Sequence, residues 1–228
     1  MKLLLILFFS FNSYAFNLKD EVDHYKKYNL NNLYTKLVND HGDGYEPLYG
    51  TRNFRAVLQG VYYRGGSNNK YNKYGSRGNM NPLPKVGLDN LCDEGFSTAI
   101  YFYTTGFDKA PKLTRCGEGQ LSYLQNSIMG GPMNQKALLT LIFKRIKGEL
   151  PGPIYGGCWN GWHASGLAGA LALRQFCGWS GDDADAYWVR NTDGNHTGYD
   201  KLRNIIRTFK QIPELKITQE EAELICPN

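Results

Sequence analysis

The sequence has few histidines, few cysteines and no long apolar run, and each shortage excludes a class of protein. The four histidines have neither a His-x-x-x-His spacing nor a Cys-x-x-Cys partner motif, so neither a metal nor another cofactor is predicted. The longest apolar run, residues 3–9, is far shorter than the roughly 20 residues of a membrane-spanning helix. A formal charge of only +5 does not favour nucleic-acid binding.

The amino terminus has the three parts of a secretory signal peptide. Lys2 is the basic start, residues 3–9 are the apolar stretch, and the Ser-Tyr-Ala at residues 13–15 is a small-x-small cleavage pattern. We expect residues 1–15 to be removed and the protein to be exported, either to a periplasm or out of the cell. A buried first strand is the competing interpretation.

Export changes how the five cysteines are interpreted, because an oxidising compartment lets thiols pair. Cys158 lies in a Gly-rich turn, unlike the surroundings of the other four, and we expect it to be free. Proximity in sequence favours the pairs Cys92 with Cys116 and Cys177 with Cys226. Four cysteines allow three pairings, so two alternatives remain open.

The chain predicts one domain, residues 51–228, preceded by an amino-terminal arm, residues 16–50, with a helix over 18–38. Short β-prone runs alternate with helical spacings through the domain, which is typical of an α/β fold with a mostly parallel central sheet flanked by helices. The expected elements are a hairpin at 56–63, strands at 98–103, 121–124 and 153–155, and helices at 86–92, 134–146, 163–177, 183–190 and 199–211.

The most informative segment is residues 158–166, Cys-Trp-Asn-Gly-Trp-His-Ala-Ser-Gly, here called the cysteine turn. A turn between a buried strand and a helix start points backbone N–H groups inward, with the positive end of the helix behind them. The same groups stabilise the thiolate of Cys158, which makes it nucleophilic. Gly161 permits the sharp turn, and Ser165 can hydrogen-bond the sulfur.

The cysteine turn resembles the signature loop of the cysteine-dependent protein tyrosine and dual-specificity phosphatases, His-Cys-x-x-Gly-x-x-Arg-Ser/Thr-Gly. Four of its six specified positions match, namely Cys158, Gly161, Ser165 and Gly166. Residues 61–66, 88–101 and 178–184 also look like segments of that family, so the resemblance covers roughly residues 51–215. It implies a phosphatase-like sheet, with the loop between a strand and the following helix and Cys158 as the nucleophile.

Two departures weaken the implied activity. The arginine of the family, which clamps the phosphate with two charge-assisted bonds, is replaced by Ala164, and its histidine by Gly157. Losing about 3 to 6 kcal/mol of transition-state stabilisation slows a reaction by roughly 10² to 10⁴. The aspartic general acid of the family has no counterpart, because residues 119–148, which contain the corresponding loop at 126–134, include no Asp or Glu.

Other residues could compensate for these losses. Trp159 and Trp162 either pack or form flat walls for a ligand, and His163 either hydrogen-bonds locally or serves as a base beside the amide of Asn160. The stretch 51–88 has no carboxylate and contains the basic cluster Arg52, Arg55, Arg64, Lys70, Lys73 and Arg77, which suits either a solvated loop or one wall of an anion-binding cleft. The candidate replacement cations are Arg64, Arg174 and Arg190.

These observations leave two main hypotheses. In the first, the protein is an exported pseudophosphatase that binds a phosphorylated or acidic ligand in the cysteine turn. In the second, it is an active cysteine-dependent phosphatase for protein or inositol phosphates, using His163 or one of the candidate arginines. A papain-like peptidase is disfavoured because the oxyanion-hole Gln before the cysteine is missing, with Gly152 in that region. A redox or purely structural role for Cys158 remains as a further alternative.

Overall fold

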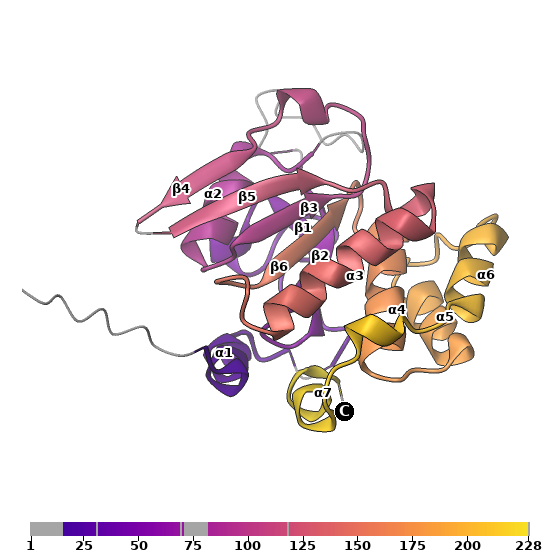
Figure 1. Cartoon of the computed structure of the whole chain (residues 1–228). Helices are drawn as coiled ribbons and strands as arrows, with labels where there is room; N and C mark the ends of the chain where they lie inside the picture. Colours follow the sequence, from indigo (N-terminus) through magenta and orange to yellow (C-terminus); the bar gives the residue numbers. More distant parts are fainter. Residues whose placement is uncertain (1–15, 31, 69, 71–81, 118, 228) are drawn as a thin grey trace, which may run out of the picture.

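The computed structural model describes residues 16–30, 32–68, 70, 82–117 and 119–227 (Figure 1). The expected signal peptide lies outside the described residues, as do Lys73 and Arg77 of the basic stretch. No helix among the described residues is long and apolar enough to cross a bilayer.

A six-stranded sheet forms the centre of the molecule, with strand order β1-β2-β6-β3-β5-β4 (Figure 1). Its strands are β1 (Thr51–Leu58), β2 (Tyr62–Ser67), β3 (Thr98–Tyr101), β4 (Leu113–Cys116), β5 (Gly119–Gln125) and β6 (Ile154–Cys158). The four central strands are mutually parallel, while β1 and β4 pair antiparallel at the two edges. The expected mostly parallel α/β sheet and the hairpin at its start are therefore confirmed.

Helices cover both faces of the sheet, because successive strand residues point to opposite sides. Tyr62 and Ile154 belong to the core beneath α3 (Pro132–Ile146) and α4 (His163–Phe176). The next residues along, Tyr63 and Tyr155, belong to the core beneath α2 (Lys85–Asp93). Nearly every residue of α4 is buried, which explains its Ala, Gly and Leu composition. In Figure 1, α5 (Gly181–Arg190) and α6 (Asp200–Thr208) lie beyond α4, away from the sheet.

The expected helix over 18–38 is wrong in its length. Helix α1 spans Leu18–Tyr25, and a 3-10 turn, Lys26–Tyr28, ends at Asn29, whose φ of 48° is left-handed and stops the helix. Val38 then forms an isolated bridge with Phe54, so the arm runs along the outer edge of β1. Tertiary pairing at the sheet edge overrides the local helical spacing.

Other boundaries also differ from the expectations. The strand expected at 98–103 ends at Tyr101, and the helix expected at 199–211 ends at Thr208. Strand β4 and helix α7 (Gln219–Ile225) were not expected, since each is short and has little periodic signal of its own. Helix α7 begins with a capping box between Thr218 and Glu221 and lies against α1 (Figure 1).

Two disulfides hold the chain together, and both expected pairs are confirmed. Cys92 on α2 is bonded to Cys116 at the end of β4, and Cys177 after α4 is bonded to Cys226 after α7. Cys158 is free and buried, as expected. The second bridge ties the carboxyl-terminal tail to the core across a sequence separation of 49 residues.

Removing the longer bridge with Cys177→Ser and Cys226→Ser together should lower the free energy of unfolding by about 4 kcal/mol, because the unfolded chain regains the entropy of a long loop. Denaturant titration under non-reducing conditions measures the change. Cys158→Ser is the matched control and should cost much less. Equal stability of the double variant and the wild type would contradict a structural role for this bridge.

Candidate functional site

The cysteine turn connects the carboxyl end of the central strand β6 to the start of α4. Cys158 is 2% exposed, and Gly161 has a φ of +77°, which favours glycine. The turn also lies directly against β2: a Cβ on Gly66 would come within 2.4 Å of the Asn160 carbonyl carbon. Gly66 and Gly161 are therefore both required for the turn to pack against its neighbouring strand.

The carbonyl groups of residues 159–163 are engaged from outside the turn or by the helix that follows. Their donors are Ser67 N for Trp159 O (3.0 Å), Asn53 Nδ2 for Asn160 O (2.8 Å), Arg64 Nη1 for Gly161 O (2.7 Å), Gly166 N for Trp162 O (3.0 Å) and Trp188 Nε1 for His163 O (3.2 Å). Most of these donors lie on β1, β2 and α5. The turn is thus held in place by its carbonyl side.

The N–H groups of the turn form the opposite side. A trans peptide points its N–H away from its C=O, so outward carbonyls leave the following N–H groups facing the other way. Within the described part of the chain, no acceptor is found for the backbone N–H groups of Asn160, Trp162, His163, Ala164 and Ser165. Several donors at the start of α4 are therefore available to one anion, with the positive end of the helix behind them.

Arg64 on β2 lies beneath the turn and is fully buried. Its Nη1 donates to Gly161 O at 2.7 Å and to Ser165 Oγ at 3.1 Å, and its Nε donates to Tyr187 OH at 2.8 Å. Cys158 Sγ lies 3.3 Å from Ser165 Oγ and donates to it. One guanidinium thus supports the backbone of the turn and, through Ser165, reaches the side chain of the cysteine.

A second guanidinium increases the positive charge at this place. Arg55 is 1% exposed, and burial, reinforced by repulsion from Arg64, lowers its pKa to about 9. Its Nη1 contacts Asn191 Oδ1. No salt bridge to Arg55 or Arg64 is found among the described residues, and Nη2 of Arg64 has no partner there. The charge of Asp193 partly compensates Arg55, but Asp193 is also paired with Lys36, so these groups together keep a net positive charge behind the turn.

Asp193 contacts the turn with an ionised carboxylate that already accepts hydrogen bonds from two side chains. Asp193 Oδ2 accepts from Trp162 Nε1 at 3.0 Å and from Lys36 Nζ at 2.8 Å. Burial raises the pKa of Asp193, but the hydrogen bond and charge of Lys36 outweigh it and hold the pKa below the usual 3.8. Asp193 therefore orients the indole and is unsuited to donate a proton.

The segment expected to hold a general acid carries amides instead. Residues 126–134 contain a 3-10 turn, Ile128–Gly130, and the start of α3. Asn126 Nδ2 donates to Asn134 O and Asn134 Nδ2 donates to Ser127 O, both at 2.9 Å. These bonds close the segment on itself. Ala164, in the first turn of α4, is fully buried and offers no side-chain donor.

The two tryptophans of the turn are fixed by their indole N–H groups. Trp159 Nε1 donates to Tyr101 OH at 2.7 Å, and the Trp159 ring lies 4.6 Å from the ring of Tyr103. Trp162 is held by Asp193, and the guanidinium of Arg52 lies 5.9 Å from its ring. Both indoles are half-buried, and because their polar atoms are used, the surface that remains is apolar.

His163 is held by a backbone carbonyl. Its Nε2 donates to Asn195 O at 2.6 Å, and its ring stacks on Tyr199 with centroids 3.9 Å apart. Burial lowers the pKa of His163, partly offset by the bond to Asn195, so the imidazole is neutral at pH 7. The hydrogen bond fixes the tautomer, and the ring adds no positive charge to the turn.

The structure brings only one of the three candidate arginines to the turn. Arg174 lies at the far end of α4, where Nη2 donates to Phe209 O at 2.6 Å, and Arg190 ends α5 with its guanidinium 3.5 Å from the Tyr34 ring. Sequence reasoning named Arg55 only as a member of the basic stretch and did not name Asn53 or Asp193. Asn53 and Arg55 lie in the carboxylate-free stretch 51–88, which indicated a possible anion site. No feature of the sequence around Asp193 indicated a role for it.

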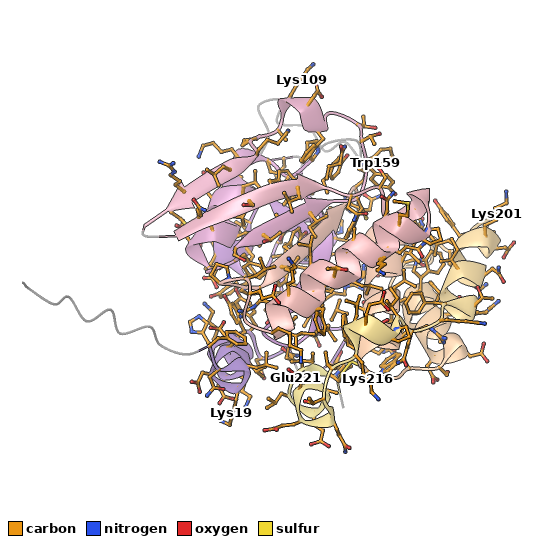
Figure 2. The ribbon with its side chains drawn as sticks, viewed as in Figure 1. Lys19, Lys109, Trp159, Lys201, Lys216 and Glu221 are labelled. Carbon is orange, nitrogen blue, oxygen red and sulfur yellow. A yellow bond between two sulfur atoms is a disulfide. The ribbon has the colours of Figure 1, made fainter. Side chains whose placement is uncertain are left out.

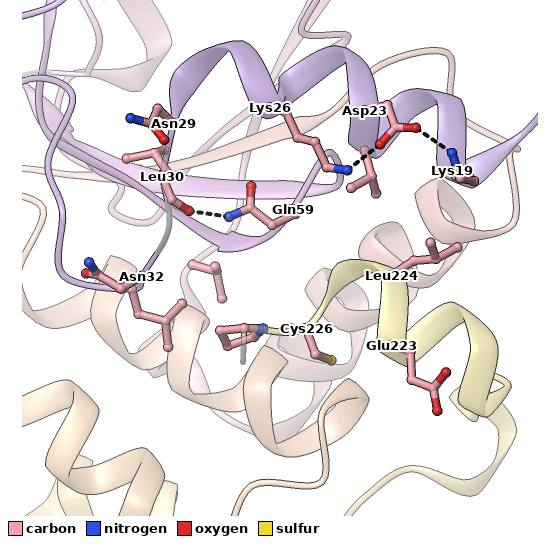
Figure 3. Close-up of a pocket in the computed structure, with 14 residues that line it drawn as sticks. Lys19, Asp23, Lys26, Asn29, Leu30, Asn32, Gln59, Glu223, Leu224 and Cys226 are labelled. Carbon is pink, nitrogen blue, oxygen red and sulfur yellow. Dashed lines mark hydrogen bonds and ion pairs between the residues drawn. The ribbon is translucent and has the colours of Figure 1, made fainter.

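No group of three or more His, Cys, Asp or Glu side chains able to hold a metal is found among the described residues. A cavity of about 630 Å³ lies apart from the turn, between α1 and the carboxyl-terminal tail (Figure 3). Figure 3 shows Asp23 bonded to both Lys19 and Lys26 at its rim, and Gln59 bonded to Leu30 O. These rim groups are hydrogen-bonded to one another, so the cavity is a weaker candidate for a functional site than the cysteine turn is.

Since the native pKa of His163 lies below the 6.5 of the unfolded chain, protonation favours the unfolded state. The contribution to stability is fully present above pH 6.5 and is lost as pH falls towards the native pKa. His163→Gln, which keeps a donor for Asn195 O, should flatten the fall of the unfolding free energy in this window. His24→Gln, at an exposed position on α1, should retain the wild-type profile; identical profiles for all three proteins would refute the assignment.

Comparison with known proteins assigns no family to the chain. No protein-family model matches it, and no curated protein matches it. The function of the cysteine turn is therefore inferred from its own geometry: a row of backbone donors, two buried guanidinium groups behind it, and a thiol at its base.

Proposed function

We propose that this protein is an exported anion-binding protein of tyrosine-phosphatase-like architecture, which holds a phosphorylated or acidic ligand in the cysteine turn without efficient turnover. The observation that carries the proposal is the polarity of the turn. Its carbonyl groups are engaged by surrounding donors, while the N–H groups at the start of α4 have no acceptor among the described residues.

A phosphate-like group suits this arrangement better than a single carboxylate does. Its several oxygens accept several N–H bonds at once, and its charge compensates Arg64 and Arg55 behind the turn. Both guanidinium groups are buried, so their field acts through a medium of low polarity and is screened less than that of surface lysines.

The same residues argue against efficient hydrolysis. Ala164 provides no clamp for the transition state, and the two amides at 126 and 134 provide no proton for a leaving group. Asp193 is held ionised by Lys36. The loss of the clamp alone corresponds to roughly 10² to 10⁴ in rate.

Export is proposed from two independent features. Two disulfides join distant segments, as is usual for proteins that fold in an oxidising compartment. Residues 1–15 have the composition of a signal peptide. The periplasm and the exterior of the cell are equally compatible with both.

One observation favours a second candidate, a slow cysteine-dependent phosphatase. Arg64, Ser165 and Cys158 form a continuous chain, 3.1 Å from Nη1 to Oγ and 3.3 Å from Oγ to Sγ. These contacts link the positive charge of Arg64 to the thiol through Ser165. Arg64 therefore takes over part of the role of the missing arginine.

The first test is binding of inorganic phosphate, measured by calorimetry at fixed ionic strength. Arg64→Met should weaken binding by about tenfold or more, because a buried charge behind the turn is lost. Arg174→Met is the matched control, since this arginine lies at the other end of α4 and bonds Phe209 O; it should bind as the wild type does. Equal affinity of the Arg64 and Arg174 variants, or no binding by the wild type, would refute the anion site.

The second test is hydrolysis of p-nitrophenyl phosphate. Under the binding proposal, the wild type shows no turnover, and Cys158→Ser binds phosphate within a few-fold of the wild type because the backbone donors remain. Turnover that Cys158→Ser abolishes would instead establish the slow phosphatase. Turnover that persists in Cys158→Ser would indicate a contaminating enzyme.

A further inference from the structure

Two apolar hollows lie beside the cysteine turn, between the start of α3 and helix α6. The first, of about 570 Å³, is lined by Met129, Tyr199, Leu202 and Ile205 among others. The second, of about 550 Å³, continues past Ile205 to Phe209 and the chain after α6. Ile205 lines both hollows, and the two are here called together the α3–α6 trough.

The trough exposes apolar surface that the fold itself does not need to expose. Met129 is 43% exposed, and Ile205, Phe209 and Ile212 are only half-buried. Apolar surface gathered along a groove is unusual on a protein without a ligand for it.

Tyr199 lies both at the first hollow and against the cysteine turn. The Tyr199 ring lines the first hollow and stacks at 3.9 Å on His163, the first residue of α4. Burial raises the pKa of Tyr103, and the Tyr103 ring lies against Trp159 of the turn. In Figure 2, Trp159 and Lys201 lie on the same side of the molecule, at the end where α3 begins.

The charge along the trough also favours an anionic ligand. Lys201 lines the first hollow, and Lys210 and Lys136 line the second, where Lys136 is ion-paired with Glu214. Asp200 is the one carboxylate lining the two hollows within the described residues. A ligand with an anionic head and an apolar chain therefore meets donors at the turn, apolar walls along the trough, and ammonium groups at its rim.

We propose that the ligand of the cysteine turn is a phosphate monoester of a long alkyl chain, that is, a lipid phosphate whose chain lies in the α3–α6 trough. The inference rests on the proposed function, since the head group occupies the anion site described above. It disfavours an inositol polyphosphate, because further phosphate groups would be placed against Met129, Ile205 and Phe209, whose side chains offer no donors.

The test compares inorganic phosphate with methyl, butyl and octyl phosphate, each below its micelle concentration, by calorimetry with the full mature chain. Each CH₂ buried in the trough should tighten binding by up to about fourfold. Octyl phosphate should therefore bind at least tenfold more tightly than methyl phosphate. Octyl glucoside, which has the chain without the anion, should bind far more weakly than octyl phosphate.

Matched variants show whether the gain in affinity with chain length comes from the trough. Ile205→Asp should abolish the dependence on chain length, whereas Ile205→Leu should keep it. Leu113→Asp is the surface control, because Leu113 is already 45% exposed on the edge strand β4 and lies outside the trough. Thermal melts identify any variant that fails to fold, and the chain-length series on the wild type then carries the test.

The outcomes separate the two proposals. If phosphate binds but affinity is the same for every chain length, the lipid inference is overturned and the anion site stands. If octyl glucoside binds as tightly as octyl phosphate, or an inositol polyphosphate binds more tightly, the inference is likewise overturned. If neither phosphate nor any alkyl phosphate binds, the proposed function fails and the inference fails with it.

Discussion

The buried guanidinium of Arg64 is the interaction on which the candidate site depends. It holds the Gly161 carbonyl, Ser165 and Tyr187 together, and so joins β2, the cysteine turn and α5 at one point. Because most carbonyl groups of residues 159–163 face donors outside the turn, the N–H groups that follow them face the inner side. Support of the turn and readiness for an anion are therefore two consequences of one arrangement.

This arrangement leaves charge and hydrogen-bonding capacity unsatisfied. Arg55 repels Arg64, and burial already depresses the pKa of Arg55 to about 9, so the fold tolerates two cations where one would be easier to accommodate. Asp193 partly neutralises Arg55, but it is shared with Lys36 from the arm and with Trp162. An anion in the turn would relieve both deficits, which is why ligand binding is a more economical explanation than structural support alone.

The sequence predicts the backbone elements that form the site better than it predicts the charged contacts around it. Alternation along β2 puts Arg64 on the same face as Tyr62, towards α4, whereas Arg174 lies about 16 Å along α4 from His163 at 1.5 Å per residue. The sequence could therefore have predicted that Arg64, and not Arg174, lies near the turn. The contact of Lys36 with Asp193 could not have been predicted in this way, because 157 residues separate the two and neither lies in a periodic pattern. The helix expected over 18–38 failed for the same reason, because pairing of Val38 with Phe54 is a long-range contact.

The two tryptophans decide what kind of molecule the anion can belong to. If their N–H groups faced the turn, they would add donors and favour a polar ligand; instead both are used by Tyr101 and Asp193. The mouth of the turn therefore combines backbone donors at its base with apolar rings at its sides, and Tyr199 extends this apolar surface towards α6. An anion alone would leave those rings exposed to water, whereas an anion that carries an apolar chain covers them. Under the proposed function, selectivity at this site depends on what is attached to the anion at least as much as on the anion itself.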